Sequence, residues 1–384
     1  MTVIESGPHR FEWYATGYEL LEAQLQAIRG ARSSIRMETY IWADDDTGRA
    51  FRRALIEAGG RGVRVTLLVD AVGGMELRRD YFAELAALPG CAMKWFNELS
   101  LATWSFRDHR KLLVVDDEAV CIGGCNIAEV YHGDGVDKGW RDGGMRIEGP
   151  VVADFAAEFD SHFATARDKQ WQVVREAKKR GKPQATPSEH GVKALFIRPG
   201  FGNNPLRAAV REDLKSARDI CVTSAYFLPA SSMRRRLRWA VARGARLRLL
   251  LGGKTDVRLM QLATRSLYRK MLRAGMHIHE YQPQVLHAKM LVIDDVVYLG
   301  SSNLDPRSLR INFEVMVRVH CAELARVARE QFEADLKLSQ EVTPEACLKA
   351  GLWTRLQQRL ARWLLGRLDP EMSAGMLRRL QLVR

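Results

Sequence analysis

Two stretches of the sequence carry the same reactive residue types at the same spacing. Each has a histidine, a lysine two positions later and an aspartate five positions after that, in "HRKLLVVDDEAVCIGGCN" and in "HAKMLVIDDVVYLGSSN". The six residues are His109, Lys111, Asp116, His287, Lys289 and Asp294. Core packing alone gives no reason to repeat histidine and lysine at a fixed spacing in two places, so we interpret the stretches as parts of one site.

The residue types in these stretches suit the transfer of a phosphoryl group. Positions i and i+2 share one face of a strand, so each histidine should lie beside its lysine. If a pseudo-two-fold axis brings the stretches together, one imidazole can act as the nucleophile and the other as acid and base. Two ammonium groups, with the amides of Asn126 and Asn303 that end the stretches, would then bind phosphate oxygens.

A carboxylate follows each stretch at an equivalent place. Aligning the Met-Arg-Ile and Val-Arg-Val triplets makes Asp142, in "GWRDGGMRIEG", equivalent to Glu314, in "RINFEVMVRVH". We predict that these carboxylates bind the far ring nitrogens of the histidines and fix their tautomers. Ion pairs with nearby arginines are the alternative interpretation. For Asp116 and Asp294, which stand at predicted strand ends, we expect a structural role within the motif.

The segments around the stretches indicate a duplicated α/β fold. A helical pattern at 17–30 precedes a strand-like run at 34–42, and a helix, a glycine turn and a strand follow. The order found over 35–96 recurs over 220–281. Strands that alternate with helices are typical of sheets covered by helices. We therefore predict two similar α/β/α sandwich halves with mostly parallel or mixed sheets, related by a pseudo-two-fold axis, with the active site at their interface.

The predicted domain boundaries follow this repeat. The four units are an N-terminal domain (1–167), a linker rich in Lys, Pro, Ser and Gly (168–192), a C-terminal domain (193–345) and a basic amphipathic tail (346–384). The first half carries extra residues just before His109, in the segment 97–108. The apolar residues in that segment are Leu99, Leu101, Trp104 and Phe106. The segment is either a loop packed under the core or an apolar lip suited to acyl chains.

The net charge and the C-terminal tail both indicate what kind of partner the chain binds. Lys and Arg number 59 against 46 Asp and Glu, a net charge of +13, which favours polyanionic partners. No run of about 18 apolar residues occurs, so we expect no membrane-spanning helix. Apolar residues recur at helical spacing in the tail at Leu352, Trp353, Leu356, Leu360, Trp363 and Leu364. Basic residues interleave with them at Arg355, Arg359, Arg362 and Arg367. This pattern predicts either an interfacial membrane helix or a helix packed on the domain.

The duplicated His-x-Lys-x4-Asp with a trailing Gly-x-x-Asn resembles the phospholipase D superfamily. Within it, the blocks "METYIWADDDTGRAF", "GGCNIAEVY", "WRDGGMRIEGP" and "GSSNLDPRSLRINFE" are most similar to bacterial cardiolipin synthases. The resemblance runs from about residue 19 to residue 319. Because the chain has no predicted membrane span, it looks like the short form of these synthases, which lacks N-terminal transmembrane helices. The first stretch ends in Gly-Gly-Cys-Asn, a variant of Gly-Ser-x-Asn.

This resemblance implies a ping-pong phosphatidyl transfer between two phosphatidylglycerol molecules through a phosphohistidine, giving cardiolipin and glycerol. It implies His109 as the nucleophile and His287 as the acid and base, with Lys111 and Lys289 at the phosphate. No cofactor and no metal ion are implied. Phosphatidylethanolamine is an alternative lipid substrate, and the implied location is the cytoplasmic side of a bacterial cell membrane, peripherally bound to its anionic surface. No nucleic-acid partner is expected, and the sequence indicates no oligomeric state.

Three other functions remain open at this stage. A phospholipase D-type hydrolase would use the same residues with water as the acceptor and release phosphatidic acid. A nuclease of the superfamily would suit the basic charge, although no basic groove interleaved with aromatic residues is evident. A basic binding protein with an inactive site is the third reading, against which the intact His and Lys pairs argue.

Overall fold

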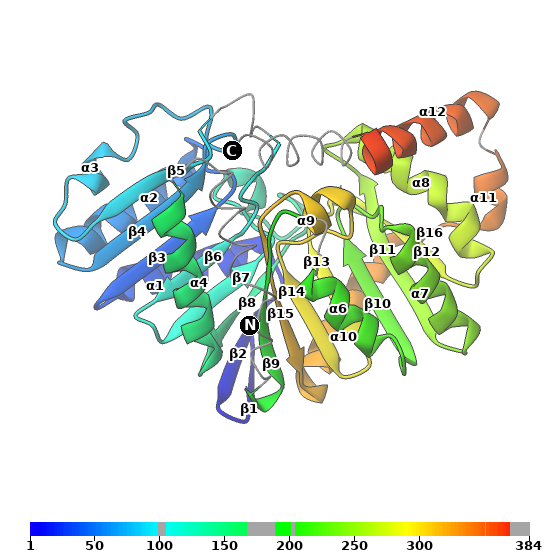
Figure 1. Cartoon of the computed structure of the whole chain (residues 1–384), viewed down its shortest axis with the longest axis horizontal. Helices are drawn as coiled ribbons and strands as arrows, with labels where there is room; N and C mark the ends of the chain where they lie inside the picture. The colour runs from blue at the N-terminus through cyan, green and yellow to red at the C-terminus, as the bar shows by residue number, and fades with distance from the viewer. Residues whose placement is uncertain (99–104, 167–188, 201–203, 350, 369–384) are drawn as a thin grey trace, which may run out of the picture.

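Two sheets with covering helices make up the fold, side by side in Figure 1. The structure is a computed structural model that describes residues 1–98, 105–166, 189–200, 204–349 and 351–368. The N-terminal half contains β1 (Thr2–Ser6), β2 (His9–Tyr14), α1 (Gly17–Gly30), β3 (Ser34–Thr39), α2 (Asp46–Gly60), β4 (Arg64–Asp70), α3 (Ala83–Ala86), β5 (Ala92–Phe96), β6 (Leu112–Val115), β7 (Ala119–Gly123), η1 (Glu129–Tyr131), β8 (Gly144–Glu148) and α4 (Val151–Thr165).

The C-terminal half repeats this plan and adds the tail helices. It contains η2 (Glu189–Gly191), β9 (Val192–Ile197), α6 (Pro205–Asp213), β10 (Asp219–Ser224), α7 (Ser231–Ala242), β11 (Arg246–Lys254), α8 (Arg258–Leu272), β12 (His277–Val285), β13 (Lys289–Ile293), β14 (Val296–Gly300), α9 (Pro306–Arg310), β15 (Glu314–His320), α10 (Ala322–Lys337) and β16 (Ser339–Glu341). The tail forms α11 (Pro344–Lys349), α12 (Leu352–Trp363) and η3 (Leu364–Leu368).

The strand orders of the two sheets show the duplication directly. In the described residues each sheet has eight strands, and β2-β8-β7-β6-β3-β4-β5 in one corresponds to β9-β15-β14-β13-β10-β11-β12 in the other. The additional strands β1 and β16 lie at opposite ends of this common order. Parallel pairing joins β3, β4 and β5 and, equivalently, β10, β11 and β12, while the other pairs are antiparallel. The prediction of two similar α/β halves with mixed sheets is confirmed.

Local sequence explains where α1 and β3 begin and end. Thr16 and Glu19 form a capping box at the start of α1, the helix predicted at 17–30. The strand predicted to reach residue 42 ends earlier, with β3 at Thr39. The next residues leave the sheet because the backbone N–H of Ile41 donates to the Asn126 side chain, 3.0 Å away. The end of β3 is thus set by a residue of the reactive stretch.

Alternation along the strands divides the core into layers. In β6, Leu113 and Val115 pack in the cluster that contains α1 and α2, whereas Leu112 and Val114 pack in the cluster that contains α4. In the second half, α6, α7 and α8 cover one face of the sheet, and α10 packs against the other. Each sheet therefore has helices on both faces, as a sandwich requires.

The two halves share one of these layers. The cluster that holds α4 also holds α10 and the facing strands of both sheets. Helix α4 contacts β9 of the second half, and α10 contacts β1 of the first. Because a single apolar core continues across the junction, the halves are fixed against each other at the level where the reactive stretches lie.

Two predicted segments fall partly outside the described residues. Of the insertion at 97–108, residues 99–104 lie outside them, and Phe106 is buried and accepts a hydrogen bond from Asn97 Nδ2 at 2.7 Å. Of the linker at 168–192, residues 168–188 lie outside them, and Val192 is the first residue of β9. The domain boundaries at these points stay predictions.

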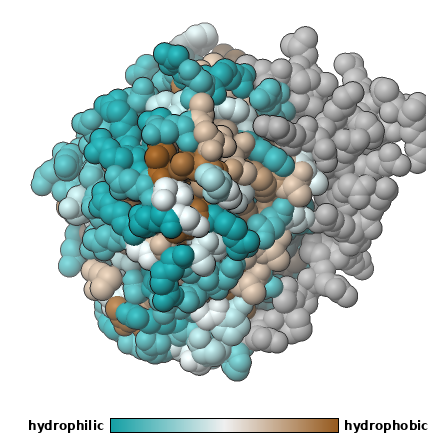
Figure 2. All heavy atoms as spheres, turned by 90° about the vertical axis from the view of Figure 1, so that its left-hand side faces the viewer, coloured by the Kyte–Doolittle hydropathy of each residue, from teal (hydrophilic) through white to brown (hydrophobic). Residues whose placement is uncertain are grey.

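The surface and the tail complete the fold. Figure 2 views the N-terminal half end on, where hydrophilic side chains cover most of the described surface around a smaller hydrophobic patch. Helix α12 lies along α8 at the opposite end of the molecule (Figure 1). Among the described residues, no helix combines the length and the apolar character needed to cross a bilayer. Residues 369–384 of the predicted tail lie outside the described part of the chain.

Candidate active site

The two reactive stretches enter the sheets in the same way. Lys111 directly precedes β6, and Lys289 is the first residue of β13. Lys111 Nζ donates to the carbonyl oxygen of His109 at 2.7 Å, and Lys289 donates to the carbonyl oxygen of His287. Both lysine side chains are buried. Each ammonium group is therefore held beside its histidine, as the i, i+2 spacing predicted.

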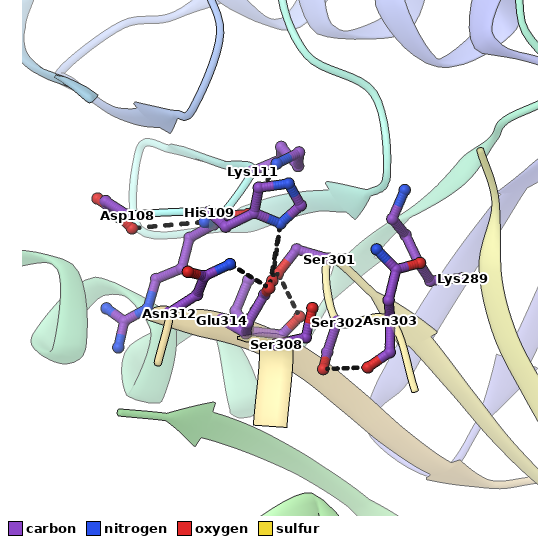
Figure 3. A network of polar contacts seen from close by, with 12 residues as sticks. Asp108, His109, Lys111, Lys289, Ser301, Ser302, Asn303, Ser308, Asn312 and Glu314 are labelled. Carbon is purple, nitrogen blue, oxygen red and sulfur yellow. Dashed lines mark hydrogen bonds and ion pairs between the residues drawn. The ribbon is translucent and has the colours of Figure 1, made fainter. Parts of the chain in front are cut away.

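The predicted carboxylates both reach the histidines, but each reaches the histidine of the other half. His109 Nδ1 lies 3.1 Å from a carboxylate oxygen of Glu314, which is fully buried. His287 Nδ1 lies 2.6 Å from Asp142 Oδ2. Figure 3 shows the first of these contacts, with His109 and Lys111 from one half and Lys289, Asn303 and Glu314 from the other gathered in one place. This exchange between halves was not predicted from the sequence.

Backbone bridges between the halves explain the exchange. The N–H of His109 donates to the carbonyl of Phe313 at 2.9 Å, and the N–H of Phe313 donates to the carbonyl of Arg107 at 2.9 Å. The equivalent pair joins His287 N–H to Arg141 O at 2.8 Å and Arg141 N–H to Val285 O at 2.8 Å. Each histidine thus pairs with the segment that leads into the opposite carboxylate, so the carboxylate meets the Nδ1 side of the ring.

These contacts fix one tautomer of His287. An ionised carboxylate can only accept a hydrogen bond, so the hydrogen lies on His287 Nδ1, which donates it to Asp142 at 2.6 Å. The lone pair on His287 Nε2 is then available for chemistry. Lys289 Nζ lies 2.7 Å from the same Nδ1 and acts on the ring through its charge. Burial would raise the pKa of Asp142, but the hydrogen bond to His287 and the Lys289 charge outweigh it and lower that pKa.

The charges of the two halves act on one another. Burial lowers the pKa of Lys111 to about 7, and the Lys289 charge adds to the fall. Burial and the Lys289 charge lower the pKa of His287 to about 4, with Lys111 contributing. Burial also lowers the pKa of His109, and Lys111 and Lys289 add to that effect. Because each lysine acts on the histidine of the other half, the four groups belong to one site.

The two Gly-x-x-Asn turns position the carboxylates by different means. In the second half, Ser301 Oγ donates to Glu314. In the first half Gly124 takes the equivalent position, and a Cβ there would lie 2.4 Å from both oxygens of Asp142. Gly143 N–H, at 2.8 Å, donates to Asp142 instead. The Gly-Gly-Cys-Asn variant therefore gives Asp142 the space that it occupies.

The two asparagines accept hydrogen bonds from the backbone through their amide oxygens. Asn126 Oδ1 accepts from Ile41 N–H, and its Nδ2 donates to Tyr131 Oη at 2.7 Å. Asn303 Oδ1 accepts from Tyr226 N–H at 3.3 Å. The amide oxygens are therefore used by the protein, which directs the NH2 groups away from the backbone. Their predicted contact with phosphate stays a prediction.

Asp116 and Asp294 lie at hairpin turns, at the far ends of their strands from the histidines. Asp116 accepts from the N–H groups of Arg32, Ser33 and Ser34 at 3.0, 2.7 and 3.0 Å. Asp294 accepts from Arg218 and Asp219 N–H at 3.0 and 2.9 Å. Both residues have positive φ, 56° and 46°. The contacts support the structural role that we expected for them.

Sequence reasoning missed the aromatic side chains around the histidines. The Tyr40 ring lies 5.0 Å from the His109 ring, and the rings of Tyr131 and Trp140 lie 5.0 and 5.4 Å from that of His287. Such contacts hold the imidazoles in place. Their positions in the sequence could have indicated this role, since Tyr40 follows β3 directly and Trp140 stands two residues before Asp142.

A buried polar cluster supports the start of the first stretch. Glu38, Asp108 and His162 bring donor atoms close enough together to surround a metal ion. The guanidinium of Arg110 lies in the same cluster, with Nη1 3.8 Å from Glu38 and Nη2 2.9 Å from Glu158. The buried positive charge of Arg110 would repel a metal ion bound at this place. Burial and the Asp108 charge raise the pKa of Glu38, so the cluster suits a shared proton better than a metal ion.

Two equivalent halves that exchange histidine–carboxylate contacts beside two lysines define a phosphodiester-transfer protein of the phospholipase D type. A profile described as "Cardiolipin synthase, PLD-like domain" matches residues 24–165 and 210–336 of the chain. The protein belongs to this family, and its resemblance to the superfamily is confirmed.

Curated relatives agree with this assignment, and a solved structure shares the fold. The chain is 32% identical over 357 residues to cardiolipin synthase A of Pseudomonas putida (strain W619), across 90% of this chain and 72% of the relative. It is 30% identical over 361 residues to the probable cardiolipin synthase YwiE of Bacillus subtilis (strain 168), across 91% and 70%. The phosphatidylserine synthase of Haemophilus influenzae Rd KW20 shares the fold, with a TM-score of 0.73 at 16% identity over 96% of this chain and 95% of that one.

Proposed function

We propose that the chain is a phosphatidyltransferase that converts two phosphatidylglycerol molecules into cardiolipin and glycerol. The observation that carries the proposal is the pair of exchanged histidine–carboxylate contacts, at 3.1 and 2.6 Å, beside two buried lysines. Membership of the cardiolipin synthase family supports the choice of lipid.

In the first step, His109 Nε2 attacks the phosphorus of the donor lipid. The bond between phosphorus and the glycerol head-group oxygen breaks, and His287 gives its Nε2 proton to that oxygen. Glycerol leaves, and the phosphatidyl group remains on His109. Glu314 accepts the Nδ1 hydrogen of His109 and stabilises the positive ring.

In the second step, His287 takes the proton of a hydroxyl group on another phosphatidylglycerol. The oxygen attacks phosphorus, the phosphorus–nitrogen bond breaks, and cardiolipin leaves with His109 restored. Lys111, Lys289, Asn126 and Asn303 bind the phosphate oxygens, whose negative charge grows in each transition state. Water in place of the alcohol would give phosphatidic acid instead.

The acid role of His287 requires a change of its pKa on substrate binding. Burial and the Lys289 charge hold this pKa at about 4 in the free chain. A phosphodiester between the lysines carries negative charge and offsets those cations, which raises the pKa toward the range where His287 keeps a proton. The same substrate charge keeps Lys111 protonated.

The proposed partner is the anionic cytoplasmic surface of a bacterial cell membrane, to which the protein binds peripherally. The net charge of +13 supports this, because each Lys or Arg near an anionic surface contributes about 1 kcal/mol. Phosphatidylglycerol is the lipid proposed for donor and acceptor, with phosphatidylethanolamine as the alternative.

Mass spectrometry of lipids after incubation with phosphatidylglycerol vesicles tests the activity. Cardiolipin with equimolar glycerol is expected; phosphatidic acid as the main product would show a hydrolase, and no product would refute the proposal. His109→Ala and His287→Ala should each abolish transfer with unchanged circular dichroism.

A donor with a nitrophenyl head group tests the order of the histidines, because nitrophenolate needs no proton to leave. His287→Ala should still release one equivalent and retain a phosphatidyl group on His109, whereas His109→Ala should release none. The reverse pattern would exchange the two roles.

A further inference from the structure

A basic cleft lies outside the histidine–lysine site, between the tail and the C-terminal half. It has a volume of about 540 Å³ and is bordered by α12, α7 and the start of α9. Its wall also includes Asp305, two residues after Asn303, which places the cleft next to the second Gly-x-x-Asn turn. Among the described residues, six cationic side chains line it: Arg207, Arg234, Lys270, Arg310, Arg359 and Arg362.

Among the described residues that line this cleft, cations outnumber carboxylates. Among the described lining residues Asp305 is the single carboxylate, and its oxygen accepts from Ser308 N–H at 2.9 Å as the N-cap of α9. Asp305 is buried, and burial raises its pKa to about 6. Burial and the charge of Arg362 lower the pKa of Arg234. Cations gathered this closely indicate a site for an anion.

Helix α12 presents an apolar ridge beside the cleft. The helix packs along α8, where Ala361 is 1% exposed. The large apolar residues of the helix point away from this contact and are 50–85% exposed: Leu352, Trp353, Leu356, Leu360 and Trp363. The packing of one face on α8 agrees with the interpretation of a helix packed on the domain, whereas the interfacial interpretation concerns the exposed face and stays a prediction. Trp363 belongs to the ridge and also lines the cleft.

The combination of ridge and cleft identifies the occupant. Leucine and tryptophan beside arginine are the side chains of a helix that lies at the boundary between head groups and acyl chains. A second copy of the chain fits poorly, because an isologous contact would bring the six cations of each cleft toward those of its partner. A soluble phosphate would use the cations but leave the ridge exposed.

We propose that this cleft binds the phosphate of an acidic phospholipid in the bilayer on which the α12 ridge docks. The lipid held here is not the one undergoing transfer, since the cleft contains neither histidine. Its phosphate contacts Arg234 and Arg362, and its acyl chains pass along Trp363 into the membrane. The choice of phosphatidylglycerol as the probe rests on the proposed function, whereas the binding of an acidic lipid does not.

Vesicle co-sedimentation of the full chain tests the cleft. The cleft variant is Arg234→Gln/Arg362→Gln, and the matched control Arg78→Gln/Arg326→Gln removes the same charge from exposed arginines elsewhere. On phosphatidylcholine vesicles that contain phosphatidylglycerol, the cleft variant should partition about 30-fold less, which corresponds to about 1 kcal/mol for each cation. The partitioning of the control variant onto the same vesicles should fall by less than about threefold. Equal losses in the two variants would overturn the proposal, because net charge alone would then explain binding.

Two further arms separate the ridge and the source of the phosphate. Leu356→Ser/Leu360→Ser should weaken binding to pure phosphatidylcholine vesicles as well, whereas the cleft variant should match the wild type there. Inorganic phosphate should not displace the protein from vesicles at equal ionic strength. If phosphate binds in the cleft but the cleft variant still partitions normally, the site serves a soluble anion and the proposal is wrong.

Folding and catalysis are followed in the same preparations. The cleft variant loses the hydrogen bond from Arg234 Nη1 to the Pro229 carbonyl, but it also relieves the repulsion between Arg234 and Arg362, so its melting temperature should stay close to that of the wild type. Arg234→Lys/Arg362→Lys should retain most of the vesicle binding. Turnover on detergent-dispersed phosphatidylglycerol should stay near the wild-type value for all these variants. A chain without any transferase activity would refute the proposed function and still leave the vesicle result to decide the cleft.

Discussion

Replacing Glu314 by glutamine should slow the formation of the covalent intermediate without unfolding the chain. Glu314 is fully buried, and one of its oxygens lies 3.1 Å from His109 Nδ1. Glutamine keeps the length of the side chain but loses the charge. His109 attacks through Nε2, so Nδ1 must carry the hydrogen and its partner must accept it. An amide that turns its NH2 group toward the ring favours the wrong tautomer.

The geometry gives the size of the effect. Two unit charges 3.1 Å apart interact by about 5 kcal/mol at an effective dielectric constant of about 20. The carboxylate favours the positive ring by this amount when Nε2 bonds to phosphorus. Since about 1.4 kcal/mol corresponds to a factor of ten in rate, we expect a loss of about 10³- to 10⁴-fold in intermediate formation.

The assay is the burst of nitrophenolate from the activated donor, followed by stopped flow. Glu314→Gln should slow the burst itself. Asp142→Asn is the matched control, because Asp142 contacts His287, whose proton the activated leaving group does not need. That variant should keep a rapid burst and lose the second step. An unchanged burst in Glu314→Gln would refute the reasoning.

A second measurement, which needs no turnover, tests whether each carboxylate contacts the histidine of the opposite half. In nitrogen NMR spectra of labelled histidine, Glu314→Gln should move the signals of His109 and leave those of His287, and Asp142→Asn should do the opposite. If each substitution instead moved the histidine of its own half, the exchange between halves would be wrong.

The remaining predictions concern the turn, the lysine and the hairpin. Gly124→Ser places a Cβ 2.4 Å from the Asp142 oxygens, so kcat should fall at least tenfold or so. The equivalent Ser301→Gly creates no such clash and removes the hydrogen bonds that Ser301 Oγ makes with Glu314 and with the Val315 backbone, so it should cost less; steady-state kinetics compare the two variants. Burial lowers the pKa of Lys111 to about 7, so its ammonium group is present below that pH and lost above it. With the nitrophenyl donor, whose release needs no proton from His287, the kcat/KM profile should therefore decline as pH rises through about 7, and Lys111→Arg should move the decline to higher pH. Asp116→Ala removes the acceptor for backbone N–H groups before β3, and denaturant melts should show a free energy of unfolding lower by about 1–3 kcal/mol, with normal turnover of the folded protein.

The sequence predicted the parts of the site and missed how they connect. The repeated spacing identified the histidines and lysines, because i, i+2 positions on a strand need no tertiary information. The alignment made Asp142 equivalent to Glu314, but equivalence does not tell which histidine each one reaches. That depends on the bridge between Asp108 and Phe313, which joins residues far apart in the chain. The aromatic neighbours were missed because such residues near strand ends are equally typical of core packing.

The exchange gives the duplication a physical consequence. In the described structure each histidine takes its orienting carboxylate and its backbone bridge from the opposite half, so neither half alone holds a complete histidine pair. The apolar layer that α4 and α10 share sets the distance between the halves and therefore the hydrogen bond of each ring. Phe155 belongs to that apolar layer and not to the histidine–lysine site, yet Phe155→Ala should loosen both histidines together. Loss of turnover should then exceed the loss expected from the unfolded fraction alone, because a shift of about 1 Å at a reacting group is enough to cost about a hundredfold in rate.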